Sequence, residues 1–483
     1  MNELPSNWLA LTLGDVVDYG SNQNVQPSSM LASHWMIELE DIERDTSRII
    51  SKTSVEQRKP QSAKSKFQAG DVLYGKLRPY LNKVLHVDFA GYCSNEIIAI
   101  TPGELNARYL YYFLKSPIFL SYVSAVTHGV RMPRLGTEQA RSAPFPLAPA
   151  SEQKRIAQKL DILVAQVNAL KAHIDRILRL IERLRESTLS SASSGMLSED
   201  WRSLNPGAKF QLHSTQLSAR TRRGVPSHVA MPDAISSFNV PSGWIWASAA
   251  ELLRAGAFID IKDGNHGTNH PKSNELGTDG LPFVTAANVL ATGRIDYEAA
   301  PKISGTPLSR IRVGFAEPGD VVFTHKGTVG RVAINDRSCV LTPQTTYYRL
   351  DSSQVSSKYL RIFLQSPLFT AQTAVVKSQT TRDFVPITAQ YALFHLLPPL
   401  PEQLEIVRRV ERLFSIAEQL EAKVATAKQR IDALTQSILA KAFRGELVPQ
   451  DPNDEPAGVL LERIRAQRAA APKPKRGRKV AAN

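Results

Sequence analysis

Cysteine is nearly absent from this chain of 483 residues. Its two cysteines, Cys93 and Cys339, belong to no CxxC pair, which excludes a disulfide framework and a cysteine-rich zinc site. Long hydrophobic runs are also missing, because no segment approaches the roughly 18 apolar residues that cross a membrane. The N-terminus has neither a basic head nor an apolar run, so no signal peptide is expected. These absences predict a reduced, cytoplasmic protein without a membrane partner.

Motifs that mark catalytic centres are missing too. Residues 70–77 (GDVLYGKL) mimic a phosphate-binding loop up to the lysine, but Leu77 replaces the serine or threonine that ligates magnesium. The sequence contains no HExxH, no GxSxG and no Asn/Asp-Pro-Pro-aromatic tetrad of adenine methyltransferases. His266 and His270 have the spacing of a helical metal pair, but glycines around them favour a polar loop. We expect no catalytic residue, cofactor or metal in this chain.

The sequence does contain a coiled-coil heptad pattern, and it contains that pattern twice. Apolar residues follow one another at alternating steps of four and three, which is typical of a coiled-coil seam. The first series is Ile156, Leu160, Leu163, Val167, Leu170, Ile174, Ile177, Ile181 and Leu184. The second series is Ile406, Val410, Leu413, Ala417, Leu420, Val424, Ala427, Ile431, Leu434 and Ile438. Since Ile156 and Ile406 are 250 positions apart, as are the later members, two helices of equal length are predicted to pair.

The repeat extends into the sequence before each helix. Pro-Ser-x-Trp occurs at Trp8 and Trp244, and Gly-Asp-Val occurs at Gly70 and Gly319. Short strands are predicted over residues 71–74, 83–87, 96–100, 321–324, 331–334 and 346–350. Short helices are predicted over 107–115 and 357–365, each stopped by Ser-Pro. The fold class is therefore α+β, with two mixed globular halves, two long helices in an intramolecular coiled coil, and an internal pseudo-two-fold repeat.

Six segments follow from this repeat. They are a globular domain (1–148), its helix (149–197), a polar linker (198–236), a second globular domain (237–398), its helix (399–448) and a C-terminal extension with a basic tail (449–483). Rods of about 40 residues would be near 60 Å long. Antiparallel rods would place the globular halves at opposite ends, and parallel rods would bring them together. The modest linker favours the antiparallel arrangement.

Charge and loop composition favour a nucleic-acid partner. Lysine and arginine number 59 against 45 acidic residues, which gives a net charge of +14. The basic tail explains part of this excess, but basic loops also follow matched strands in both halves. Such donors fit phosphates and guanine edges, and amides fit adenine edges. The candidate contact residues are Lys76, Arg78, Lys83, Arg131, Arg134, Lys262, His266, His325, Lys326, Arg331, Lys377, Gln379 and Arg382.

The sequence resembles the DNA-specificity subunits of type I restriction-modification enzymes. The resemblance is carried by the repeated Pro-Ser-x-Trp start, the Gly-Asp-Val strand, the Tyr-Leu…Ser-Pro helix and the Glu-Gln start of each heptad helix. Residues 437–448 (SILAKAFRGELV) are the most specific match. The resemblance covers nearly the whole chain apart from the linker and the basic tail. It implies two target recognition domains that each read half of a bipartite, asymmetric sequence of double-stranded DNA.

The resemblance also implies partners. The paired helices would act as a ruler across unread base pairs and would dock two adenine methyltransferase subunits, through which restriction or translocase subunits would join. S-adenosylmethionine, ATP and magnesium would belong to those partners, so this chain is expected to be non-catalytic. Two alternatives stay open from the residues alone: a stand-alone DNA-binding protein, and a coiled-coil scaffold that does not bind DNA.

Overall fold

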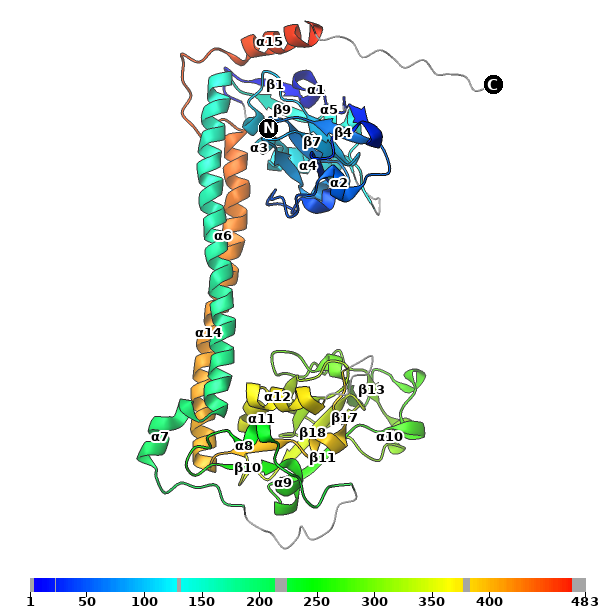
Figure 1. Cartoon of the computed structure of the whole chain (residues 1–483), viewed down its shortest axis with the longest axis vertical. Coiled ribbons are helices and arrows are strands. Elements are labelled where there is room, and N and C mark those ends of the chain that lie inside the picture. The colour runs from blue at the N-terminus through cyan, green and yellow to red at the C-terminus, as the bar shows by residue number, and fades with distance from the viewer. Residues whose placement is uncertain (1–3, 22, 128–131, 213–223, 377–382, 471–483) are drawn as a thin grey trace, which may run out of the picture. The chain divides into compact units, whose positions relative to one another are not determined.

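The computed structural model describes residues 4–21, 23–127, 132–212, 224–376 and 383–470 (Figure 1). Contacts divide the chain into two compact units. The first unit contains residues 1–175 and 425–483, and the second contains residues 176–424. Each unit holds one globular half with one end of α6 (Ala150–Ser193) and the opposite end of α14 (Leu400–Ala442).

The first globular half is built from short strands in three small sheets. Its strands are β1 (Leu9–Thr12), β2 (Asn24–Val25), β3 (Trp35–Ile37), β4 (Lys64–Phe67), β5 (Val72–Gly75), β6 (Val84–His86), β7 (Gly91–Cys93), β8 (Ile97–Ile100) and β9 (Pro144–Leu147). The strand orders are β6-β5-β8, β2-β4-β7-β3 and β1-β9. All pairs are antiparallel except β3 with β7.

Helices and aromatic side chains form the core of this half. The helices are α1 (Leu13–Val16), α2 (Val55–Arg58), α3 (Ala107–Leu114), α4 (Pro117–Val126), α5 (Thr137–Arg141) and, from the C-terminal extension, α15 (Ala457–Ala470). Tyr109 of α3 packs against Phe145 of β9. Phe113 of α3 packs against both Phe119 of α4 and Phe145. Phe443, just beyond α14, lies 5.0 Å from the Tyr109 ring. The Ala-Phe-Arg-Gly sequence after the second heptad helix therefore inserts an aromatic residue into the core of the first half.

The second globular half has a closely similar set of elements. Its strands are β10 (Ile245–Ser248), β11 (Phe258–Asp263), β12 (Leu281–Val284), β13 (Lys302–Ile303), β14 (Phe315–Ala316), β15 (Val321–Thr324), β16 (Val332–Ile334), β17 (Cys339–Leu341), β18 (Thr345–Leu350) and β19 (Phe394–Leu397). The strand orders are β11-β18-β15-β16, β13-β12-β17-β14 and β10-β19. Its helices are α7 (Glu199–Leu204), α8 (Asp233–Ser236), α9 (Ala249–Ala255), α10 (Gly305–Ser309), α11 (Ser357–Leu364), α12 (Pro367–Val376) and α13 (Ile387–Gln390). The predicted polar linker thus contains α7 and α8.

The repeat seen in the sequence is confirmed by equivalent elements in the two halves. The predicted strands near residues 71–74 and 321–324 are β5 and β15, and the predicted short helices are α3 and α11. The buried Tyr109 hydroxyl donates to the Pro146 carbonyl over 2.7 Å, and Tyr359 donates to Leu396 over the same distance. Each short helix is thereby tied to the last strand of its half.

A buried tryptophan fastens each half to the start of its long helix. The Trp8 indole donates to Glu152 over 2.8 Å, and the Trp244 indole donates to Glu402 over 2.8 Å. The carboxylate of Glu402 also accepts from Arg202 over 2.6 Å. The Pro-Ser-x-Trp and Glu-Gln repeats are therefore hydrogen-bonding partners, although they stand far apart in the sequence.

The long helices are antiparallel, as predicted. In the first unit Lys171 of α6 forms an ion pair with Asp432 of α14 over 2.7 Å. In the second unit Arg185 of α6 pairs with Glu421 over 2.9 Å. The residue number rises along one helix as it falls along the other, which defines the direction of pairing. Among the described residues, no helix combines the length and apolar character needed to cross a membrane.

The predicted heptad seam is only partly correct. Val167, Ile174 and Ile181 are buried, as the pattern requires. Leu170 and Ile177 were predicted in the same seam, but they are 47% and 40% exposed. The positions four residues after these three buried residues, Lys171, Leu178 and Arg185, are partly buried and complete the buried face. The predicted seam residues Leu163 and Leu184 are also partly buried. Helix α14 repeats this rotation, because Leu420 and Leu434 are exposed as well.

Candidate nucleic-acid interface

The basic residues that follow β5 lie in a turn held by backbone contacts. Leu77 pairs with Arg134 as an isolated antiparallel bridge. The Arg78 N–H donates to the Pro133 carbonyl over 2.8 Å. Arg78 itself has a φ of 49°, in the left-handed region where the chain can turn sharply. These contacts bring Lys76, Arg78 and Arg134 together beyond one end of β5.

The second half builds the same turn after β15. Lys326 pairs with Phe384 as an isolated antiparallel bridge, and the Gly327 N–H donates to the Asp383 carbonyl over 3.0 Å. The Lys326 ammonium lies 5.4 Å from the centre of the Phe384 ring. Residues 325–327 thus pair with residues 383–385 as residues 76–78 pair with residues 133–135. Both halves present an exposed cation, Arg78 or Lys326, from a fixed turn.

Lys83 and Arg331, two of the predicted contact residues, donate to backbone carbonyls inside the protein, and the Arg134 guanidinium donates to the Glu96 carboxylate over 2.8 Å. The Lys83 ammonium donates to the Leu39 carbonyl over 2.7 Å. The Arg331 guanidinium donates to the Val289 carbonyl over 3.0 Å. Both side chains are half-buried, and each residue directly precedes an edge strand of its sheet, β6 for Lys83 and β16 for Arg331. We therefore interpret Lys83 and Arg331 as residues that position the turns.

The structure does not support a DNA contact by His325. Its side chain is fully buried, and Nδ1 lies 2.6 Å from the Thr346 hydroxyl. Burial lowers the pKa of His325 to about 4, so the ring is neutral at physiological pH. Because a base contact would require the ring to leave the core, we remove His325 from the candidate set.

The glycine-rich loop after β11 is a polar loop. His266 is exposed, and its Nε2 lies 2.7 Å from the Asp263 carboxylate. His270 Nδ1 lies 3.1 Å from the Asn265 carbonyl. The two rings thus have separate partners, and no group of three or more metal-ligating side chains occurs among the described residues. Lys262 is half-buried on β11, in register with Tyr347.

Four predicted contact residues, Arg131, Lys377, Gln379 and Arg382, lie outside the described residues. In the sequence they follow the ends of α4 and α12 within six residues. The sequence-based prediction missed Tyr80, whose ring is exposed two residues after Arg78. A tyrosine in an Arg-Pro-Tyr turn is a weak signal, because most tyrosines of this half, such as Tyr19 and Tyr74, are buried.

Comparisons with known proteins identify the family to which this duplicated sequence belongs. Residues 5–179 match the family model of the type I restriction modification DNA specificity domain. The specificity subunit of the type I restriction enzyme EcoKI from Escherichia coli K12 is 30% identical over 393 residues, which cover 77% of this chain and 74% of the relative. The EcoBI specificity subunit from Escherichia coli is 29% identical over 394 residues, covering 79% and 76%.

Solved structures share the fold. One chain, from a study of complex assembly and conformational transition of the type I R-M system, has a TM-score of 0.65 at 21% identity and covers 92% of this chain and 100% of its own. The HsdS subunit from Thermoanaerobacter tengcongensis has a TM-score of 0.53 at 21% identity, covering 92% and 98%. The fold is thus a duplicated α+β unit in which each half ends in one of two long, paired helices. By its similarity to the curated relatives, the chain belongs to the specificity subunits of type I restriction enzymes.

Proposed function

We propose that this chain selects the DNA sequence for a type I restriction-modification complex and performs no chemical step itself. The observation that carries the proposal is the turn that both halves build after a matched strand, with Arg78 in one and Lys326 in the other. Cations on such turns supply salt-dependent contacts to phosphates, and a few side chains read base edges. Each half would read one part of a bipartite target, with the antiparallel helices setting the spacer.

A methylation map tests the proposal directly. Genomes of the host with and without this gene are compared for modified adenines. Loss of one bipartite motif upon deletion is the expected result, and it also supplies the target. An unchanged map would contradict the proposal. DNA binding without any change in methylation would indicate a stand-alone DNA-binding protein.

Variants of the two turns test which residues contact DNA. Arg78→Ala should weaken recognition of one half-site, and Lys326→Ala should weaken recognition of the other, each by about tenfold or more. Lys423→Ala, at an exposed position of α14, is the matched control for charge. Equal losses of DNA affinity in all three variants would mean that the turns act only through the net charge of the protein. Lys76 and Arg134 are the next positions to test in the first half.

We further propose that two methyltransferase subunits dock on the exposed apolar residues of the helices. Leu170 of α6 and Leu420 of α14 are equivalent in the repeat, so two equivalent docking sites are expected, one in each unit. Restriction subunits would join through this complex. A Leu170→Asp, Leu420→Asp variant should lose co-purification with the methyltransferase yet keep its fold. Ala172→Asp adds the same charge on another face of α6 and should leave co-purification intact.

A further inference from the structure

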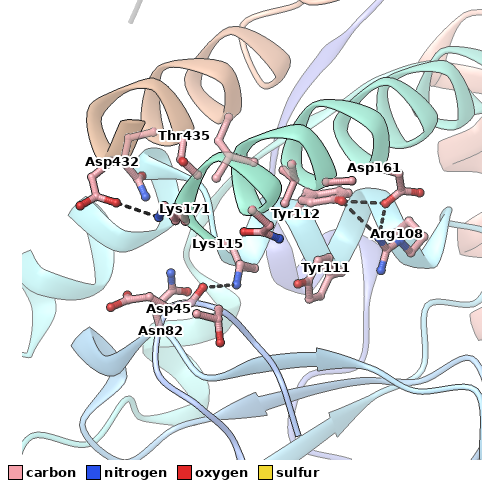
Figure 2. A pocket seen from close by; sticks show the side chains of 16 residues that line it. Asp45, Asn82, Arg108, Tyr111, Tyr112, Lys115, Asp161, Lys171, Asp432 and Thr435 are labelled. Atoms are coloured by element: carbon pink, nitrogen blue, oxygen red, sulfur yellow. Dashed lines mark hydrogen bonds and ion pairs between the residues drawn. The ribbon is translucent and has the colours of Figure 1, made fainter. Parts of the chain in front are cut away.

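A polar cavity of about 500 Å³ lies in the first unit between the globular half and the long helices (Figure 2). Helix α3 and two turns, which hold Asp45 and Asn82, border it on the side of the globular half. Helices α6 and α14 border it on the other side, where Val164 and Leu439 supply apolar surface. Its volume is in the range of small-molecule sites. The proposed DNA contacts make no use of this cavity.

The charged groups of the cavity balance one another, with one exception. Arg108 forms an ion pair with Asp161, and Lys171 forms one with Asp432. Lys115, at the end of α3, is only 8% exposed and has no ion pair with a carboxylate among the described residues. Such a buried ammonium is costly unless an anion compensates it. Asp45 also lines the cavity, but its carboxylate pairs with the exposed Arg44, so Lys115 is the buried charge that lacks a carboxylate partner.

The hydrogen bonds of Lys115 go to neutral groups. Its ammonium donates to the Asp45 backbone carbonyl over 2.7 Å and to the Ser47 hydroxyl. Since an ammonium has three N–H donors, one remains for a further acceptor. The ammonium also lies 5.4 Å from the centre of the Tyr111 ring. Burial lowers the pKa of Lys115 to about 8, so it is still protonated at neutral pH.

Asn82 supplies an unused acceptor in the same cavity. Its side chain is 4% exposed, and Oδ1 accepts no hydrogen bond from any described residue. Buried polar atoms in native proteins almost always have a partner. Asn82, Asp45 and Ser47 also have positive φ values, 49°, 60° and 61°. Non-glycine residues held in this region cluster at functional sites.

We propose that the cavity binds a small organic anion whose carboxylate or phosphate accepts from Lys115 and whose hydroxyl or amino group donates to Asn82 Oδ1. The rings of Tyr111 and Tyr112 form part of the wall against which the carbon skeleton packs. Only the first half has these groups at this place. The Ser-Pro repeat aligns Lys115 with Gln365, which has no charge. Asn82 lies on the same connection between β5 and β6 as Arg78, but Lys115 has no charged counterpart in the repeat, and the inference does not depend on the proposed function.

Calorimetry on the full chain tests this site with four probes. Glycerol 3-phosphate and L-lactate each carry an anionic group and a hydroxyl, inorganic phosphate lacks the carbon skeleton, and glycerol lacks the anion. Saturable binding of glycerol 3-phosphate or lactate, with at least about tenfold weaker binding of glycerol, is expected. The comparison of the first two probes identifies the preferred anion. Absence of saturable binding by both would overturn the proposal.

Variants locate the binding. Lys115→Gln gives the first half the residue of the second and should weaken binding of the anionic probe at least about tenfold. Asn82→Ala should weaken glycerol 3-phosphate binding without changing inorganic phosphate binding, and it keeps the test valid if Lys115→Gln fails to fold. Gln365→Lys is the control in the second half and should change nothing. Binding that survives both substitutions in the cavity would place the probe elsewhere and refute the proposal.

Discussion

At the scale of single residues, the two buried indole–carboxylate pairs distinguish the halves. Glu402 has the Arg202 guanidinium as a charged partner. Among the described residues, Glu152 accepts from two neutral donors, the Trp8 indole and the Gln450 amide. Burial raises the pKa of Glu152, in keeping with a carboxylate that has lost hydration. The Trp8 indole is therefore the more important of the two anchors.

Trp8→Phe tests this difference. The substitution leaves a buried carboxylate oxygen without its donor and should cost about 1–3 kcal/mol of unfolding free energy. Trp244→Phe should cost less, since Arg202 still compensates the charge. Hydrogen exchange measured separately in each half, with urea denaturation, checks both values. Glu152→Gln removes the charge and should restore part of the stability of the Trp8→Phe variant; a further loss would contradict this account.

Lys115 should make stability depend on pH in a definite direction. Its pKa is about 8 in the folded chain because of burial, and about 10.4 in an unfolded chain. Between these values the unfolded state binds more protons, so the unfolding free energy rises with pH, by up to about 3 kcal/mol. The Asp45 carboxylate opposes this lowering of the Lys115 pKa, whereas the cations Lys171 and Arg108 add to it. Lys115→Met should abolish the rise; an identical pH profile for both proteins would show that Lys115 does not titrate there.

At the scale of elements, the sequence predicted which segments are helices and strands but misplaced one face of the long helices. The buried residues Val167, Ile174 and Ile181 can be joined in a seam by either of two neighbouring rows of the helix. One row contains Leu170 and Ile177, and the other contains Lys171 and Arg185. The row that the structure uses contains Lys171 and Arg185, whose long aliphatic stems cover the seam while their charges reach acidic partners. A pattern based on apolar residues cannot detect such a row. It selected Leu170 and Ile177 instead.

Two isoleucines of α6 test the rotated seam with the same chemical change. Ile181 is 3% exposed and Ile177 is 40% exposed. Ile181→Ala should lower the unfolding free energy by about 2–4 kcal/mol, because it removes buried methyl groups and leaves a cavity. Ile177→Ala should cost less than about 1 kcal/mol in the isolated chain. Urea midpoints give both numbers, and equal losses would mean that both residues share the seam.

At the scale of the whole molecule, the repeat predicted the architecture better than the sites. The 250-residue repeat and the positions of the strands and helices follow from local sequence. The antiparallel direction of the long helices follows from the length of the chain that connects them. The contacts that matter at the sites join residues far apart, such as Trp8 with Glu152, or Asn82 and Lys115 around one cavity. His325 is the clearest case: a histidine after a strand suits either DNA or a core, and only packing against Thr346 decides. Sequence proximity carries no information on such burial.

Deletion of one matched heptad from each helix tests the helices as a ruler. Residues 182–188 of α6 and 418–424 of α14 lie opposite each other around the Arg185–Glu421 ion pair. Because both segments are removed together, the remaining residues of the two helices keep their pairing register. The stalk becomes about 10 Å shorter, equivalent to about three base pairs. A heptad returns the helix to almost the same face, whereas three base pairs rotate DNA by about 100°. Because the deletion also removes Leu420, proposed above to dock a methyltransferase, DNA binding by the isolated chain is the readout. Binding to a duplex with both half-sites at the original spacer should therefore fall at least about tenfold, while each half-site keeps its base preference in binding assays with single half-sites. Glu182→Gln with Glu418→Gln, at exposed positions of the same heptads, should bind this duplex normally. Unchanged binding by the deletion variant, at the same spacer, would mean that something other than the helices fixes the distance between half-sites.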